Sequence, residues 1–234
     1  MREHSVNSHR FERKFIIPGN LVYSIEQIIK ASSAMFSEVF YPRFVNNIYF
    51  DSVSFQFFHD NINGVSERTK ARIRWYGDLE RDIKKPVLEF KQKFGLTGIK
   101  TAFPLEPFSL RDIGVPNFRS SLFQKSALDF HRKELMISLK PTLINRYRRK
   151  YFLSADRKFR ITLDHCLEYF PANLFENISI RRFNDSISMI MELKYDKEHQ
   201  PESSELTQEF LFRLVKNSKY VRGIQILHDI GHDA

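Results

Sequence analysis

Basic residues recur at alternate positions in several segments whose composition is typical of β-strands. In "KARIRWYG" (residues 70–77), Arg72 and Arg74 would share one face of a strand, and the apolar residues between them would take the other. Two guanidinium groups this close repel each other unless water or an anion lies between them. Their planar, multiply donating groups are well suited to phosphate oxygens. The pattern therefore indicates either a solvated sheet face or one wall of an anion-binding cavity.

The same alternation occurs in other segments, where a carboxylate often precedes a lysine by two positions ("ERK", "EFK", "ELK"). The sets that would share a face are Glu12 and Lys14; Glu89, Lys91 and Lys93; Arg160, Thr162 and Asp164; and Glu192, Lys194 and Asp196. In "NRYRRKY" (145–151) both faces carry basic residues, so that segment does not discriminate between them. An ordinary sheet with one wet face shows such a pattern. A barrel with its charged face inward would instead collect these cations in a lumen that holds a polyanion.

Composition narrows the choice of partner and compartment. The chain has 234 residues, a net charge of +9 and a pI near 9.6, so an anionic partner is expected: nucleic acid, a membrane surface or phosphates. A single cysteine, Cys166, excludes an internal disulfide and fits a reducing compartment. No apolar run has the length of a membrane span, and the first residues lack the apolar centre of a signal peptide. These features predict a cytoplasmic protein.

The elements that position the charged residues alternate between strand and helix. Helices are predicted after Asn20, over 117–135, and after Ser203 or Ser204 with Leu206, Phe210 and Leu214 on one face. The predicted strands are 11–17, 44–51, 71–77, 86–93, 143–153, 159–164 and 186–196. Short turns between strands favour a mainly antiparallel sheet with flanking helices, an α+β class. Few glycines and no linker favour a single domain over residues 1–234.

Eight of these segments, in order, resemble one known family. They are "RFERKFIIP", "NNIYFDS", "KARIRWYG", "LEFKQK", "RYRRKYF", "FRITLD", "MELKYD" and "NSKY". They resemble the VTC domain, the polyphosphate polymerase domain of the vacuolar transporter chaperone complex and its bacterial relatives. That domain belongs to the triphosphate tunnel metalloenzymes, with the CYTH-like triphosphatases and adenylate cyclases. The resemblance implies an antiparallel β-barrel whose lumen is a basic tunnel, and it places Arg72 and Arg74 inside that tunnel.

The resemblance also implies a set of site residues. Glu192 matches the carboxylate that holds a metal, Mn²⁺ or Mg²⁺. The matching phosphate-binding residues are Lys14, Arg72, Arg74, Lys91, Lys100, Arg149, Arg160, Lys194, Ser218 and Lys219. All of these except Lys100 and Ser218 are also implied as catalytic. Two positions depart from the family pattern: Arg10 replaces the first glutamate of Glu-x-Glu-x-Lys, and Ala102 lies where a second basic residue is expected.

The function that the resemblance implies is transfer of the ATP γ-phosphoryl group to a growing polyphosphate chain. The departure at Arg10 disfavours the triphosphatase and cyclase activities. Two alternatives stay open: a tripolyphosphate or nucleoside-triphosphate hydrolase, and a non-catalytic module that binds polyphosphate. The expected partners are ATP and inorganic polyphosphate, not nucleic acid, because no RNA-binding signature is found. The SPX sensor domain and membrane helices of eukaryotic relatives are not found, which suggests a stand-alone domain or a separate membrane-protein partner.

Overall fold

The computed structural model describes residues 10–79, 82–95, 97–172, 182–185 and 189–228. It confirms the α+β class. The strands are β1 (Arg10–Ile17), β2 (Ser37–Asp51), β3 (Glu67–Tyr76), β4 (Val87–Phe94), β5 (Thr97–Pro104), β6 (Lys140–Leu153), β7 (Arg160–Pro171), β8 (Phe183–Asp185) and β9 (Met189–Asp196). The helices are α1 (Ile25–Lys30), α2 (Gln56–Ile62), α3 (Pro116–Gln124), α4 (Phe130–Ser138), α5 (Gln200–Glu209) and α6 (Lys219–His228), with short 3₁₀ turns at Gly19–Leu21, Leu110–Gly114 and Lys197–His199.

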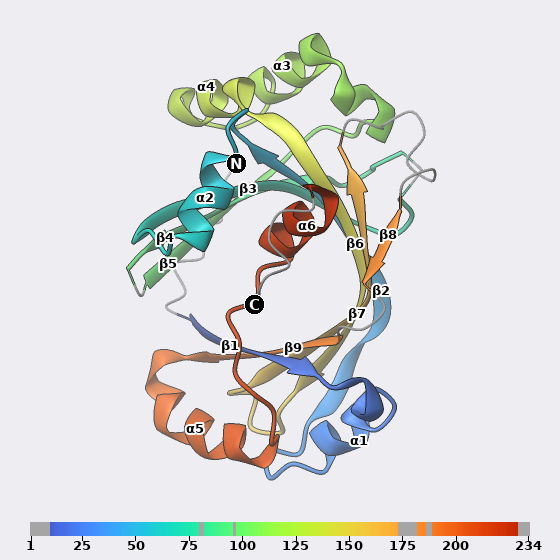
Figure 1. Cartoon of the computed structure of the whole chain (residues 1–234), viewed down its shortest axis with the longest axis vertical. Helices are drawn as coiled ribbons and strands as arrows, with labels where there is room; N and C mark the ends of the chain where they lie inside the picture. Colours follow the sequence, from blue (N-terminus) through green and yellow to red (C-terminus); the bar gives the residue numbers. More distant parts are fainter. Residues whose placement is uncertain (1–9, 80–81, 96, 173–181, 186–188, 229–234) are drawn as a thin grey trace.

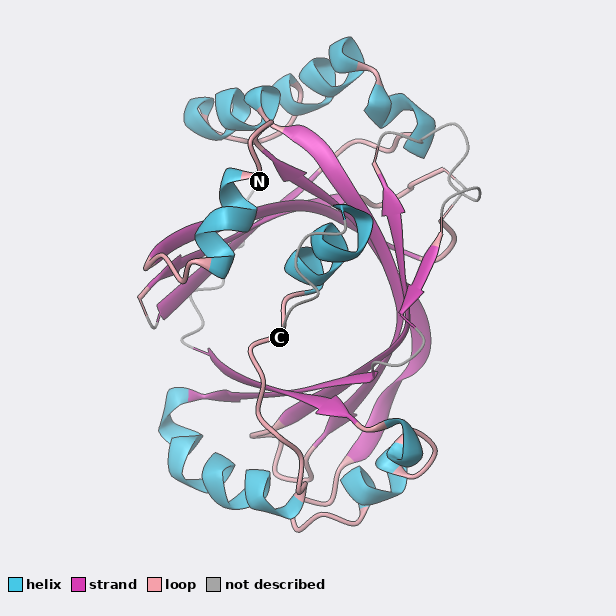
Figure 2. Ribbon diagram, in the orientation of Figure 1, coloured by secondary structure: helices cyan, strands magenta, loops and turns pink. Residues whose placement is uncertain are grey.

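All of these strands belong to one antiparallel sheet. Its order is β1-β9-β7-β6-β2-β3-β4-β5, and β8 pairs with β7. The sheet curls so far that its two ends approach each other (Figure 2), and we call the inner side of this curl the tunnel. The expected barrel is not closed by hydrogen bonds, because β1 and β5 are the two ends of the described ladder. Side chains bridge the gap instead: Lys91 Nζ on β4 lies 3.5 Å from Glu12 Oε2 on β1.

Helices cover the outer face of the curled sheet in two groups (Figure 1). Near β2–β5, α3 and α4 bury Phe123 and Met136 in one apolar cluster. At the opposite side, α1 contributes Ile29 to a second cluster that includes Phe210, the residue after α5. Many apolar strand residues point outward into these two clusters, which leaves positions on the inner face for polar groups.

Helix α6 differs from these four helices because it lies inside the ring of strands (Figure 1). Tyr220 and Ile224 pack in a third cluster with inward-facing residues of β2 and β6, including Tyr49. Phe58 of α2 packs in the same cluster. The rings of Tyr220 and Tyr49 stack with centroids 5.0 Å apart. The chain enters α6 through Asn217, whose backbone oxygen accepts a hydrogen bond from Lys14 Nζ (2.9 Å). Helix α6 therefore fills part of the tunnel and brings its first residues to the charged wall.

Several sequence predictions about elements need correction. The helix predicted after Asn20 begins only at Ile25, after a short 3₁₀ turn at Gly19–Leu21. The helix predicted over 117–135 is two helices, because Asp129 accepts a hydrogen bond from the amide of Arg132 and starts α4 anew. Helix α5 ends at Glu209, before Leu214, because Leu211 adopts a positive φ of 47°. Strand β5 was not predicted. Among the described helices, none combines the length and apolar character needed to cross a membrane.

Candidate functional site

The inward arginines of β3 converge on a carboxylate of β4. Arg72 lies opposite Glu89 in the strand register and donates from Nε to Glu89 Oε2 at 2.8 Å. Arg74 Nη1 lies 3.5 Å from Glu89 Oε1, and Lys100 Nζ of β5 lies 2.5 Å from the same oxygen. Burial would raise the pKa of Glu89, but these three cations hold it well below its usual range. We call these four residues the Glu89 cluster.

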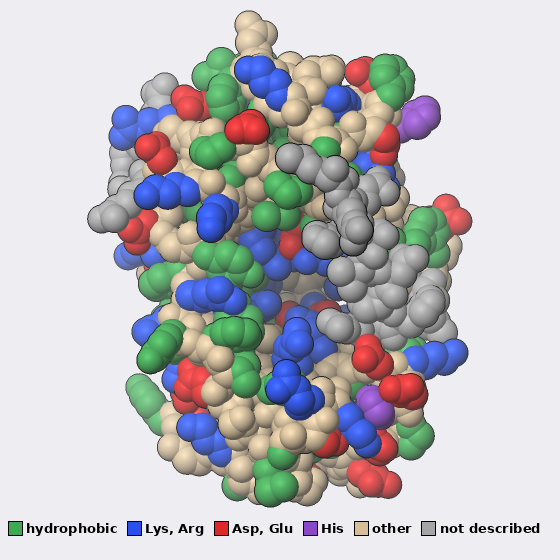
Figure 3. All heavy atoms as spheres, turned by 180° about the vertical axis from the view of Figure 1, so that it is seen from behind, with side chains coloured by type: hydrophobic (Ala, Val, Ile, Leu, Met, Phe, Trp, Pro, Cys, Tyr) green, Lys and Arg blue, Asp and Glu red, His purple; other side chains and the backbone are tan. Residues whose placement is uncertain are grey.

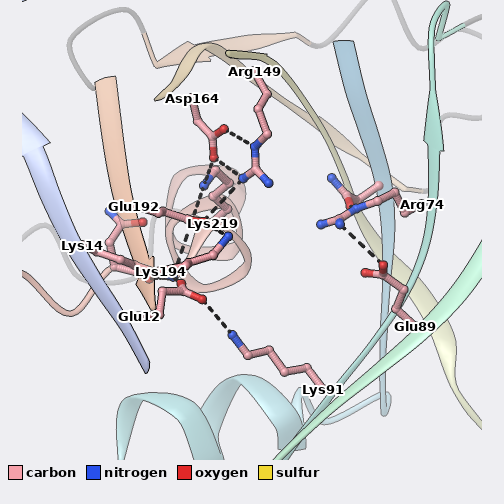
Figure 4. Close-up of polar contacts among 12 residues, drawn as sticks. Glu12, Lys14, Arg74, Glu89, Lys91, Arg149, Asp164, Glu192, Lys194 and Lys219 are labelled. Atoms are coloured by element: carbon pink, nitrogen blue, oxygen red, sulfur yellow. Dashed lines mark hydrogen bonds and ion pairs between the residues drawn. The ribbon is translucent and has the colours of Figure 1, made fainter. Parts of the chain in front are cut away.

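A second group of charges surrounds Glu192 on the opposite wall (Figure 4). Its carboxylate oxygens lie 2.8 Å from Lys194 Nζ, 3.3 Å from Lys219 Nζ, 3.6 Å from Arg149 Nη2 and 3.7 Å from Lys14 Nζ. Burial alone would raise the pKa of Glu192, but the four cations lower it well below the usual range. These five residues form the Glu192 cluster, which joins β1, β6, β9 and α6.

Asp164 on β7 supports the Glu192 cluster from behind. It lies opposite Arg149 in the β6–β7 register and is fully buried. Arg149 donates to it from Nε at 2.5 Å and from Nη2 at 2.6 Å, and Lys219 Nζ lies 2.6 Å from Oδ2. Although burial would lower the pKa of Arg149 and Lys219, Asp164 raises both, so both stay charged. This carboxylate therefore fixes two cations that face the tunnel.

Glu12 completes the wall and could hold a divalent cation together with Glu192. Lys14 Nζ lies 2.9 Å from Glu12 Oε1 and 3.7 Å from Glu192 Oε1, so one ammonium group contacts both carboxylates. Burial and Glu192 would raise the pKa of Glu12, but Lys14, Lys91 and Lys194 lower it to about 2. Mg²⁺ is often held by one or two carboxylates plus phosphate oxygens and water, so this pair fits. Among the described residues no group of three or more His, Cys, Asp or Glu could hold a metal alone.

Lys70 is a tunnel cation of a different kind, and it was missed as a candidate although it shares a strand face with Arg72. Its Nζ donates to Ser218 Oγ at 2.8 Å, just before α6. Within the described residues it makes no ion pair with a carboxylate. Burial, followed by repulsion from Lys14, Lys91 and Arg72, lowers its pKa well below the usual range. Lys70 and Ser218 are therefore placed to receive an added anion.

Replacing Lys70 with methionine should stabilise the ligand-free protein and weaken anion binding. A lowered pKa in the folded state means that charged Lys70 destabilises the fold at neutral pH. This cost disappears as the pH rises past the unfolded-state pKa of about 10.4. We expect a higher melting temperature at pH 7, a gain that shrinks toward pH 10, and roughly tenfold weaker binding of tripolyphosphate.

The same variant should change the protons exchanged on binding. At a pH where part of Lys70 is uncharged, wild-type protein should take up protons when tripolyphosphate binds, because an anion favours the charged form of Lys70. Calorimetric titration in two buffers of different ionisation enthalpy measures this uptake. The Lys30→Met variant, on the exposed end of α1, is the control. An unchanged melting temperature with unchanged proton uptake in Lys70→Met would contradict this account.

The structure brings most of the sequence-predicted residues to one inner face (Figure 4). Arg160 is the exception: it is exposed at the edge of that face and makes no ion pair or hydrogen bond within the described part of the chain. Ala102 lies beside Glu89 in register, so its small side chain leaves Lys100 as the basic residue of β5. Most of these cations contact a carboxylate, which the sequence analysis did not expect, but the four carboxylates Glu12, Glu89, Asp164 and Glu192 leave a surplus of positive charge for an anion.

Those carboxylates, Glu12, Glu89 and Asp164, were not predicted as site residues. The alternation had already placed each of them on the charged face. The sequence did not indicate which strands pair, and that pairing places each carboxylate beside its cations. Seen from behind, the molecule has a central hollow in which Lys and Arg side chains gather with a few acidic ones (Figure 3).

This curled sheet with a basic inner face shares its fold with several solved structures. It is similar to a candidate adenylate cyclase from Bacillus halodurans, with a TM-score of 0.56, 13% identity, and 92% of this chain and 96% of that chain covered. A candidate adenylate cyclase from Vibrio parahaemolyticus has a TM-score of 0.52 and 12% identity, with 92% of this chain and 98% of that chain covered. A Pyrococcus horikoshii protein has a TM-score of 0.50 and 13% identity, with 94% of this chain and 99% of that chain covered. At these identities the likeness concerns the fold alone.

A match to a protein-family model is more specific than a likeness of folds. The VTC domain model matches residues 9–228, nearly the whole chain. The chain belongs to the VTC domain family. No curated protein matches it in sequence.

Proposed function

We propose that this protein is a metal-dependent polyphosphate polymerase that transfers the γ-phosphoryl group of ATP to the end of a polyphosphate chain. The observation that supports this most is the state of the tunnel carboxylates. Glu12, Glu89, Asp164 and Glu192 are all paired with cations and have lowered pKa values, which makes them poor general bases. A hydrolase must activate water, whereas the end of a polyphosphate chain is an anionic nucleophile that needs no base.

In the proposed reaction the protein positions and neutralises phosphates. Phosphoryl transfer needs electrostatic stabilisation of the equatorial oxygens and alignment of the attacking and leaving oxygens. Arg72 and Arg74 on one wall and Arg149 on the other would bind the triphosphate, with Lys14 and Lys194 neutralising charge. Each of these cations is already oriented by a carboxylate, so little reorganisation is needed when the substrate enters.

A divalent cation, Mn²⁺ or Mg²⁺, would be held by Glu12 and Glu192 and would supply positive charge that neutralises the phosphates. Lys14 contacts both carboxylates and would bind a phosphate oxygen beside them. Lys219 is held by Asp164 as well, so it would remain beside the metal-binding pair.

A product assay tests the proposal against its two alternatives. The pure protein is incubated with ATP and Mn²⁺, and polyphosphate and orthophosphate are measured separately. Chain growth matched to ADP release is expected. Release of orthophosphate without polyphosphate would make the protein a hydrolase. Tight binding of polyphosphate with no ATP turnover would make it a binding module.

Replacing Arg74 with alanine should weaken tripolyphosphate binding and ATP turnover together. Arg74 faces the tunnel and its loss removes a charge-assisted contact to phosphate, for which we expect about a tenfold to hundredfold effect. Binding is measured by calorimetry and turnover by ADP release. Arg132→Ala, on the outer helix α4, is the matched control and should change neither. Equal effects of the two variants would contradict the assignment of Arg74.

A further inference from the structure

Three aromatic rings surround an arginine next to the tunnel cations. The Arg43 guanidinium carbon lies 4.4 Å from the ring centroid of Tyr76, 5.0 Å from that of Tyr151 and 5.5 Å from that of Phe40. Phe40 and Tyr151 also meet edge to face, with centroids 5.6 Å apart. We call these four residues the Arg43 cluster. Within the described chain Arg43 makes no ion pair with a carboxylate; the three rings hold it, together with a hydrogen bond of 3.4 Å from its Nε to the Tyr151 hydroxyl.

Strand register places the Arg43 cluster on the inner face. Tyr76 lies two positions beyond Arg74 on β3, and Tyr151 lies two positions beyond Arg149 on β6. Side chains two apart on a strand share a face, at a spacing of about 7 Å. Arg43 itself pairs with Arg149 across β2 and β6. The cluster therefore continues the rows of phosphate-facing cations toward one end of the tunnel.

The two ends of this row are not alike. On β3 the inward residues run Lys70, Arg72, Arg74 and Tyr76. Lys70 is covered by Ser218 at the start of α6, through a hydrogen bond of 2.8 Å. Tyr76 is 49% exposed and Phe40 is 58% exposed, so these rings offer open faces to a ligand. Rings that served only to pack the protein interior would be buried.

We propose that the Arg43 cluster is a nucleobase-binding platform, which stacks the base of a nucleoside triphosphate whose phosphates lie against Arg74 and Arg149. Bases stack on aromatic rings and on guanidinium planes, and such stacking adds affinity that phosphate contacts alone do not supply. The spacing of about 7 Å between the platform and the nearest arginines suits the ribose that joins base to phosphate. The nucleotide enters phosphates first from the end that α6 does not cover.

This inference rests on the proposed function only in taking the tunnel as a triphosphate site, and its test separates the two. Affinities for ATP and for tripolyphosphate are measured by calorimetry without divalent metal, so that no turnover occurs. The Tyr76→Leu variant keeps apolar bulk but loses the aromatic plane. We expect ATP affinity to fall about 5-fold or more, while tripolyphosphate affinity changes less than about twofold, because tripolyphosphate has no base to stack.

Two further variants serve as controls. Tyr76→Phe should restore ATP affinity, because stacking needs the ring and not the hydroxyl. Tyr23→Leu, an exposed tyrosine outside the tunnel, should leave both affinities unchanged. Equal losses for ATP and tripolyphosphate in Tyr76→Leu, or no loss for either, would overturn the platform and leave the triphosphate site standing. If the wild type binds neither ligand, the proposed function fails as well.

Discussion

Replacing Glu192 with glutamine should lower metal-dependent ATP turnover by about 100-fold or more and tighten metal-free binding of tripolyphosphate. Glu192 is the acidic centre of four tunnel cations, within 2.8–3.7 Å of Lys194, Lys219, Arg149 and Lys14. Removing its charge leaves these cations with fewer protein partners and a stronger attraction for phosphate. The same change removes one of the two carboxylates that could hold a divalent cation.

The opposite directions of the two effects make this variant informative. Metal-free affinity is measured by calorimetry with tripolyphosphate, and turnover by ADP release with Mn²⁺. The control is Glu26→Gln on α1, whose carboxylate pairs with Lys150 on the outer face at 2.5 Å. Undiminished turnover in Glu192→Gln would remove the metal-binding role of this residue. Weaker metal-free binding would mean that Glu192 orients the cations more than it competes with phosphate.

Replacing Asp164 with asparagine should lower the free energy of unfolding by about 3–5 kcal/mol. Asp164 is fully buried and is the nearest counter-charge of both Arg149 and Lys219. Without it, two cations would stay inside the protein with only part of their charge compensated. Tripolyphosphate should recover part of the loss, because phosphate oxygens supply the missing negative charge and binding stabilises the folded state.

The pH dependence gives this prediction a second readout. Burial would raise the pKa of Asp164, but Arg149 and Lys219 lower it in the folded protein. Its stabilising contribution is therefore complete above the unfolded pKa of about 3.9 and is lost as the pH falls toward the folded value. Urea unfolding of wild type and variant should converge as the pH drops below about 4. Asp156→Asn, on an exposed turn, is the control; a loss below about 1 kcal/mol in Asp164→Asn would contradict the account.

The alternation along single strands predicted which side chains share a face, and β3 shows how far that goes. Arg72 and Arg74 face the tunnel as predicted, and the same pattern would have included Lys70. On β6 the pattern was ambiguous because basic residues occupy both faces. Only pairing with β7 selects the inner one, since Arg149 meets Asp164 while Lys150 points outward to Glu26.

Contacts between distant elements lie beyond what a strand pattern can indicate. Lys219 reaches the Glu192 cluster from a helix that enters the tunnel, and nothing in its local sequence predicts that position; only the family resemblance did. The Arg43 cluster has the same cause, because Phe40 and Arg43 meet Tyr76 and Tyr151 through the pairing of β2 with two neighbours. Such sites depend on sheet order, which the sequence left open between a flat and a curled sheet.

The central claim is that the inner face of the curled sheet binds a chain of phosphates, and a crystal structure with tripolyphosphate tests it most directly. The account predicts phosphate oxygens within hydrogen-bonding distance of Arg72 or Arg74 on one wall and of Arg149 or Lys194 on the other. It also predicts that Lys70, which lies beside Ser218, contacts a phosphate group of the bound tripolyphosphate. Tripolyphosphate bound only on the outer surface, with the cations of the Glu89 and Glu192 clusters still paired to their carboxylates, would contradict it.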